Sequence, residues 1–105
     1  MAGIDKSLEL TPGAREKLHK KVVKIWHLGK TEPEKSIERA FKLFNEGYRT
    51  EFICRCIAAG YRQRKEYKKE IDFLVEVERD FEHYAFDGTL RRALRLLEKT
   101  GESYQ

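Results

Sequence analysis

The sequence predicts an all-α protein, a small single-domain bundle of about five helices. Apolar residues recur at intervals of three and four along most of the chain, which is the spacing of one helix face, and no segment shows the sustained alternation of a strand. The two prolines each stand where a helix is expected to begin. The 105 residues are 40% apolar and 38% charged, which suits one core beneath a heavily charged surface. We expect a flexible arm over 1–10, a helical domain over 11–100 and a tail over 101–105.

The first helix is expected to begin at Thr11 and Pro12 and to end at Gly29. Threonine caps the free N–H groups of a first turn, proline at the first helical position has no N–H that needs a partner, and glycine stops helices. Between these signals the core stripe consists of Leu18, Val22, Ile25 and Trp26. Lysines cover the opposite face, and they are Lys17, Lys20, Lys21 and Lys24.

Two shorter helices are expected next, each bounded by a capping residue and a glycine. Thr31 and Glu34 have the spacing of a capping box at the start of the second helix, and Gly47 is expected to end it. Thr50 is expected to cap the third helix, and Gly60 to end or kink it. The apolar stripes are Ile37, Ala40, Phe41 and Phe44 in the second helix, and Phe52, Ile53, Cys56 and Ile57 in the third.

The longest helical pattern extends from about Arg62 to Tyr84. Its stripe consists of Tyr67, Ile71, Leu74 and Phe81, interrupted by Glu78 and widened by Phe73, Val75 and Val77. An apolar face wider than one neighbour needs indicates a central helix or a dimer contact. After a turn at Asp87, Thr89 is expected to cap a last helix that Gly101 ends. The stripe of this last helix consists of Leu90, Ala93, Leu94 and Leu97.

Charge is distributed unevenly along the chain, whose net charge is +4. Residues 1–69 carry 17 Lys/Arg against 9 Asp/Glu, residues 70–87 carry one Arg against 7 acids, and residues 88–105 carry 4 Lys/Arg against 2 acids. Such polarity suits a polyanion on the basic side and a basic partner, or a second copy of the chain, on the acidic side. The alternative is that both are solvated helix faces that pair within the fold.

A helix-turn-helix-like segment is expected between Leu43 and Ile57. It reads Leu-Phe-Asn-Glu-Gly-Tyr-Arg-Thr-Glu-Phe-Ile-Cys-Arg-Cys-Ile. This pattern resembles the DNA-binding domains of the resolvase and transposase type, which have a leucine-containing helix, a Glu-Gly-Tyr turn, a small cap and a helix with Ile before a small residue. Gly47 matches the turn, Thr50 falls close to the cap, and Ile53 and the following cysteine stand where Ile-Ala is usual. The resemblance covers about 30 residues of the chain.

The resemblance implies that the following basic helix enters DNA and that the chain is a small nucleic-acid-binding regulatory protein, with DNA favoured over RNA. Arg and Gln read guanine and adenine edges, and Lys neutralises phosphates. The expected nucleic-acid-binding residues are Arg49, Arg55, Arg62, Gln63, Arg64, Lys65, Lys68 and Lys69. Two features depart from the family pattern, because Ala58 and Ala59 precede Gly60, and Arg64 stands where an apolar anchor is expected. An ordinary bundle with a solvated basic face is the alternative.

Three tyrosines interleave with these cations, and they are Tyr48, Tyr61 and Tyr67. Tyrosines between cations stack on the bases of single strands and RNA loops, which keeps RNA open as a ligand. At helix boundaries, tyrosines also serve as half-buried core residues.

A second hypothesis is a helical protein-interaction module or inhibitor that docks a basic partner through its acidic, aromatic helix 70–86. The expected partner-binding residues are Asp72, Glu76, Asp80, Phe81 and Tyr84. A homodimer is a further form of this hypothesis.

No catalytic residues, cofactor or metal site is expected. Cys54 and Cys56 point about 200° apart on a helix, so they cannot bridge each other, and a single Cys-x-Cys is a poor zinc pattern. We expect two buried thiols in a reducing compartment. Among the histidines, His19 and His27 could share a face, but no third metal ligand can be placed beside them, and His83 is expected on a separate helix. The acidic segment lacks the burial that a general acid and base would need.

The sequence also bears on location. No run of 18 apolar residues is present, so no membrane span is expected. The first ten residues contain no signal-peptide core, so we expect a cytoplasmic protein.

Overall fold

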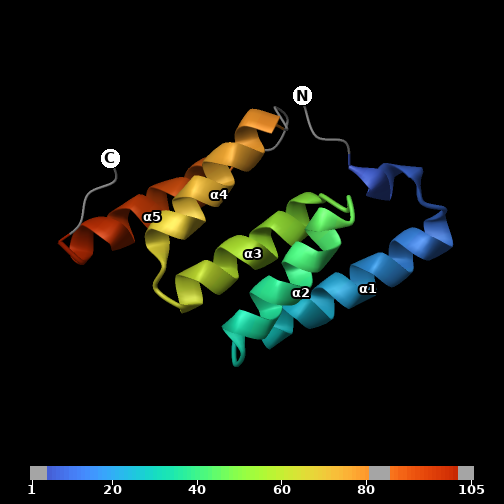
Figure 1. Ribbon diagram of the computed structural model, residues 1–105, viewed down its shortest axis with the longest axis horizontal. Coiled ribbons are helices and arrows are strands. Elements are labelled where there is room, and N and C mark those ends of the chain that lie inside the picture. Colours follow the sequence, from blue (N-terminus) through green and yellow to red (C-terminus); the bar gives the residue numbers. More distant parts are fainter. Residues whose placement is uncertain (1–4, 81–85, 102–105) are drawn as a thin grey trace.

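The computed structural model describes residues 5–80 and 86–101, which form five α-helices and one short 3-10 helix and contain no strand (Figure 1). The elements are η1 (Lys6–Glu9), α1 (Pro12–Leu28), α2 (Pro33–Asn45), α3 (Glu51–Gln63), α4 (Tyr67–Asp80) and α5 (Asp87–Lys99). The predicted all-α bundle is therefore confirmed. None of the helices in the described ranges combines the length and apolar composition that a membrane span requires.

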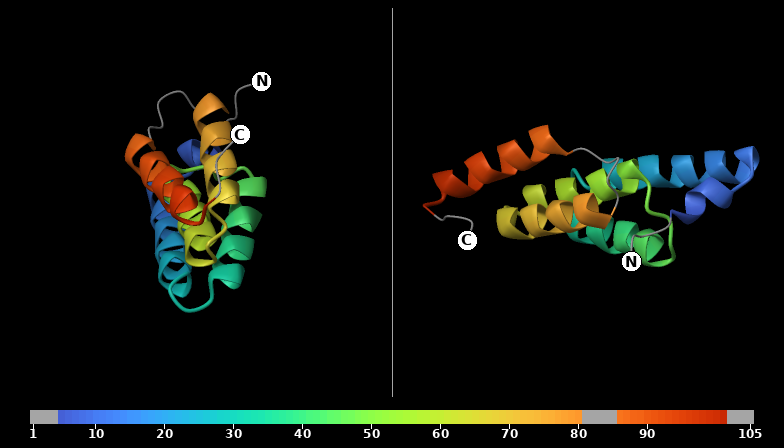
Figure 2. Two further views of the ribbon diagram at one scale, coloured as in Figure 1. Left: turned by 90° about the vertical axis from the view of Figure 1, so that its left-hand side faces the viewer. Right: turned by 90° about the horizontal axis from the view of Figure 1, so that it is seen from above.

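α3 is the central helix of an elongated molecule that measures 47 × 33 × 20 Å. α1 and α5 lie on one side of α3, and α2 and α4 lie on the other (Figure 2). Short connections make consecutive helices neighbours in space, so the chain folds as a series of helical hairpins (Figure 1). The wide apolar face of the segment that begins near Arg62 indicated either a central helix or a dimer contact; in the structure the central helix is α3, one helix earlier.

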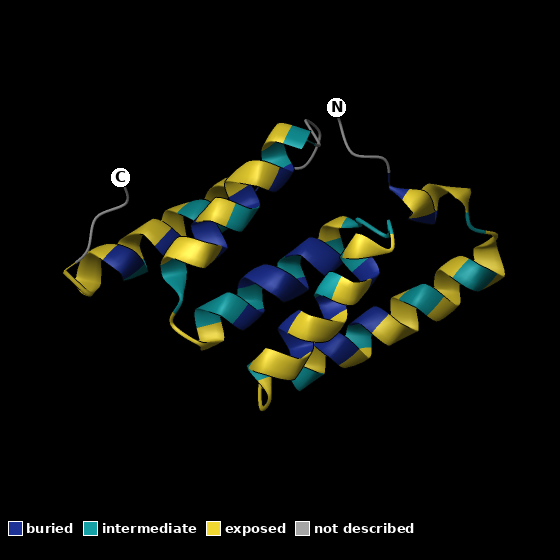
Figure 3. Cartoon of the chain, viewed as in Figure 1, coloured by how far each residue is buried: buried dark blue, intermediate teal, exposed yellow. Residues whose placement is uncertain are grey.

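The core consists of three apolar clusters along α3 and α4 (Figure 3). The first joins α1, α2 and α3 around Val22, Ile53 and Cys56. The second joins α3, α4 and the start of α5 around Cys54 and Leu74, and a third joins α4 to α5. Cys54 and Cys56 are both buried and free, as expected, and they serve different clusters because they point to different sides of α3. Burial raises the pKa of each thiol to about 12.

Two of the four expected threonine caps are formed. The hydroxyls of Thr11 and Thr50 accept hydrogen bonds from backbone N–H groups three residues later, at 3.2 and 3.1 Å. The prediction of a capping box at Thr31 is wrong, because α2 begins at Pro33 without a side-chain cap. Thr89 lies within the first turn of α5 and does not cap it.

Gly60 was expected to end or kink the third helix, and it does not end it, because α3 continues through it to Gln63. A Cβ built on Gly60 would lie 2.4 Å from Cγ1 of Ile37, so glycine is needed here for the close approach of α2 and α3. The next helix then begins at Tyr67 instead of Arg62. In contrast, Gly47 has a φ of 108° just after α2, as expected of a glycine that ends a helix.

Part of the expected N-terminal arm is packed against the turn between α2 and α3. The carboxylate of Asp5 is buried and accepts hydrogen bonds from the backbone N–H groups of Ser7 and Arg49, at 2.9 and 3.0 Å. The N–H of Lys6 donates to the carbonyl of Gly47 at 2.8 Å. The segment from Asp5 onward therefore belongs to the fold, which differs from the expected flexible arm. Residues 1–4 and 102–105 of the expected arm and tail lie outside the described residues.

Candidate nucleic-acid interface

The expected recognition helix is not formed as one element. The six residues expected on it divide among the end of α3 (Arg62 and Gln63), the turn after it (Arg64 and Lys65) and the first turn of α4 (Lys68 and Lys69). Arg49 and Arg55, expected beside the DNA backbone, lie in the α2–α3 connection and on α3. The turn is made at Arg64 and Lys65, and Lys65 has a φ of 59°. A row of side chains on one helix, which duplex readout by a helix-turn-helix requires, is therefore split by a change of chain direction.

Arg62 on α3 forms an ion pair with Glu70 on α4, with 2.5 Å between Nη2 and Oε2. Its Nε also donates to the same oxygen at 3.1 Å. Glu70 is 0% exposed, whereas the Arg62 side chain is 24% exposed. Burial raises the pKa of Glu70, and the hydrogen bond and charge of Arg62 and the charge of Arg92 oppose that rise. Glu70 thereby fixes the position of a guanidinium that still reaches the surface.

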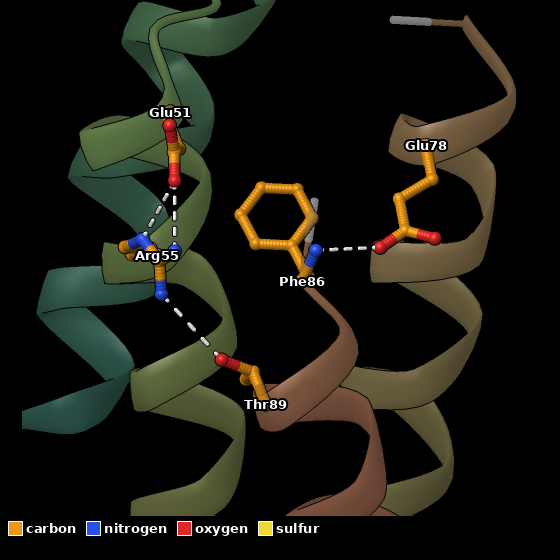
Figure 4. Close-up of polar contacts among 5 residues, drawn as sticks. All are labelled: Glu51, Arg55, Glu78, Phe86 and Thr89. Atoms are coloured by element: carbon orange, nitrogen blue, oxygen red, sulfur yellow. Dashed lines mark hydrogen bonds and ion pairs between the residues drawn. The ribbon is translucent and has the colours of Figure 1, made fainter. Parts of the chain in front are cut away.

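Arg55, earlier on α3, connects this helix to α5 (Figure 4). Its Nη2 lies 2.7 Å from Oε1 of Glu51, and its Nη1 donates to the hydroxyl of Thr89 at 3.5 Å. The guanidinium also lies 5.2 Å from the ring centroid of Phe86, whose N–H donates to Glu78 at 2.7 Å. These contacts hold the start of α5 beside α3.

Two other expected residues are engaged with their own chain. Arg64 is 36% exposed and pairs with Glu34 at 3.7 Å and with Glu66 at 3.4 Å. Arg49 lies 4.7 Å from the ring centroid of Phe44 and donates through Nε to the Phe44 carbonyl. Both guanidiniums therefore have partners within the chain, and Arg64 also remains partly exposed.

Two adjoining cavities open along α3 between α1 and α5, with volumes of about 290 and 300 Å³. They share Arg62 and Arg92 in their walls and together form one depression, which we call the arginine groove. Its polar and aromatic walls include Trp26, Lys30, Arg55, Arg62, Gln63 and Arg92. None of the described residues that line it is acidic. Small residues such as Ala59 and Gly29 are also among its lining residues.

Three of the six wall residues named above, Trp26, Lys30 and Arg92, were not among the expected nucleic-acid-binding residues. Trp26 was assigned to the core stripe of α1, but it is 37% exposed. Lys30 follows α1, and Arg92 belongs to α5, about 30 positions after the closest expected residue on α3. A surplus of cations after residue 87 was the only sequence signal for Arg92.

Further basic residues surround α1. A cavity of about 440 Å³ between α1 and α2 is lined by Lys21, Lys24, Arg39 and Lys42, together with a single acid, Glu46. Hollows with an excess of cations therefore border α1 on both sides.

A cavity of different character lies on the other side of α3. It has a volume of about 460 Å³, and three of its lining residues are the expected partner-binding acids Asp72, Glu76 and Asp80. The other two expected partner-binding residues, Phe81 and Tyr84, lie outside the described residues, as does His83.

No cluster of histidine, cysteine or acidic side chains suited to a metal ion is present in the described part of the chain. No protein-family model, curated protein or solved structure matches the chain. The geometry of the grooves is therefore the basis for a functional interpretation.

Proposed function

We propose that this chain is a small nucleic-acid-binding protein that holds a single strand in the arginine groove. The observation that carries the proposal is the convergence of Arg55, Arg62 and Arg92 from two helices on one depression without acidic lining. Guanidiniums bind phosphate oxygens through paired N–H groups, so a polyanion in the groove would share Arg55 and Arg62 with their carboxylates, Glu51 and Glu70, and would meet Arg92 as a further cation.

A single strand suits this groove better than a duplex does. Trp26 and Lys30 stand at one end of the groove and Thr89 at the other, so a strand along α3 would meet an indole ring as well as cations. Bases stack on aromatic rings in proteins that bind single strands, whereas a helix-turn-helix needs an exposed recognition helix. The regulatory role, the preference for DNA, the cytoplasmic location and the absence of catalysis belong to the same proposal.

The proposal is tested by fluorescence anisotropy with labelled single-stranded oligothymidine, a duplex of the same length and the corresponding RNA, at about 50 and about 200 mM salt. Arg92→Ala is the test variant. Arg91→Ala is its matched control, because Arg91 is an exposed arginine on the same helix that does not line the groove. We expect Arg92→Ala to weaken binding about tenfold and Arg91→Ala to change it less than about twofold. Equal losses in both variants, or no binding at low salt, would refute the proposal.

A further inference from the structure

The cavity between α2 and α4 has an aromatic floor, and we call it the aromatic groove. The floor is made by four partly buried rings, Phe41, Phe44, Tyr61 and Phe73. Phe73 lies with its ring centroid 5.5 Å from those of Phe41 and Phe44, and Phe41 lies 6.3 Å from Tyr61, all in edge-to-face arrangements. Each such arrangement holds its two rings at a steep angle, and all four rings line the cavity.

The wall of the aromatic groove on α4 is acidic. Asp72, Glu76 and Asp80 recur at intervals of four residues, so they lie along one face of the helix, and all three line the cavity. Arg49 and Lys69 are the cations among the described lining residues, which leaves an excess of negative charge. Glu76 and Asp80 form no ion pair with any described residue; the ion pairs of the described part of the chain involve other acids.

The groove already accommodates one guanidinium. Arg49 lines it and lies 4.7 Å from the ring centroid of Phe44. A planar cation on a ring face is attracted by the negative charge density of that face, and the attraction is stronger where water is partly excluded. The same chemistry is open to a second guanidinium on the remaining rings, with the carboxylates of Glu76 and Asp80 as its counter-ions.

We propose that the aromatic groove docks a short arginine-containing segment of a partner protein. One guanidinium lies on the rings of Phe73 and Tyr61, and flanking basic side chains face Glu76 and Asp80. The acids disfavour nucleic acid at this groove by like-charge repulsion. A second copy of the chain also carries exposed arginines, Arg91 and Arg95 on α5, so self-association is measured as an outcome of the test.

This inference is independent of the proposed function. The arginine groove lies between α1 and α5 and the aromatic groove between α2 and α4, on the two sides of α3 (Figure 2). A strand and a basic segment can therefore occupy the molecule together, so the protein would connect a nucleic acid to a protein.

The test uses a fluorescein-labelled peptide of alternating arginine and alanine, with lysine–alanine and glutamate–alanine peptides for comparison. Binding is followed by anisotropy for the full chain and for Glu76→Lys/Asp80→Lys. The matched control is Glu38→Lys/Glu98→Lys, which makes the same change in net charge at exposed acids outside the groove. We expect the groove variant to lose about tenfold in affinity and the control to lose less than about twofold.

A second variant tests the aromatic floor. Phe73→Leu keeps an apolar side chain but removes a ring face, so the preference for the arginine peptide over the lysine peptide should fall. Circular dichroism confirms that each variant is folded.

Equal losses in groove and control variants, or equal binding of the glutamate peptide, would overturn the inference. If sedimentation equilibrium shows self-association that Glu76→Lys/Asp80→Lys abolishes, the occupant of the groove is a second copy of the chain and the partner segment is ruled out. Oligothymidine binding by these variants is measured separately, so failure of one proposal is distinguishable from failure of the other.

Discussion

The fully buried carboxylate of Glu70 holds the guanidinium of Arg62. The pair connects α3 to α4, and its arginine end reaches the arginine groove. One side chain therefore has two roles, since it neutralises a buried acid and presents positive charge to solvent. An anion in the groove must share Arg62 with Glu70, while Arg92 offers a second cation nearby.

Replacing Arg62 with methionine should destabilise the fold by about 3 kcal/mol, because it leaves Glu70 buried without its partner. The double variant Arg62→Met/Glu70→Leu should recover most of this loss, since two apolar groups need no ion pair. Urea denaturation of the wild type and the three variants, including Glu70→Leu alone, gives the coupling between the two sites. A single-variant loss below about 0.5 kcal/mol would show that the pair is structurally unimportant.

The same carboxylate predicts a pH dependence of stability. Burial raises the pKa of Glu70 above its ordinary value of 4.5, so between 4.5 and the raised value the folded state binds more protons than the unfolded state. The contribution of Glu70 to the free energy of unfolding therefore falls as pH rises through that window. Urea unfolding as a function of pH should show that the wild type loses stability relative to Glu70→Gln as pH rises above 4.5. A constant difference between the two proteins would contradict the raised pKa.

Gly60→Ala should destabilise the protein by about 1–3 kcal/mol, although alanine is the better helix former. The added methyl group would meet Cγ1 of Ile37, and a buried contact between α2 and α3 leaves little room for either helix to move. Gly13→Ala is the control, because a Cβ at this exposed helical position meets no neighbour. Thermal unfolding curves should show a lower Tm for Gly60→Ala than for the wild type, and an unchanged or higher Tm for Gly13→Ala. Adding Ile37→Ala to Gly60→Ala should cost less than the two single changes predict together.

The helices could be predicted from sequence because the periodicity of apolar residues is local information. The error at the start of α4 has a specific cause, since the chain turns at Lys65 with a positive φ and not at the nearest glycine, Gly60. Glycine normally takes such a conformation, so a lysine gives no signal of a turn. The arginine groove could not be predicted, because Trp26 and Arg92 are brought to α3 only by tertiary packing.

Cys54 and Cys56 should react slowly with Ellman's reagent in the folded protein. Burial raises the pKa of each thiol to about 12, so the reactive thiolate is scarce near neutral pH, and both sulfur atoms lie in apolar clusters. In denaturant both thiols should react rapidly. Rapid reaction of either thiol without denaturant would show that α3 opens to solvent far more readily than its buried position implies.

The single tryptophan makes the two grooves distinguishable in one sample. Trp26 lines the arginine groove and is partly exposed, and it does not line the aromatic groove. Oligothymidine should therefore quench tryptophan fluorescence, because a base stacked on the indole ring alters its excited state and its contact with water. The arginine–alanine peptide should bind without this change. Quenching by the peptide, or its absence on binding the strand, would place the ligands elsewhere on the molecule. Trp26→Phe, which keeps an aromatic ring, should retain strand binding, whereas Trp26→Ala should weaken it about tenfold.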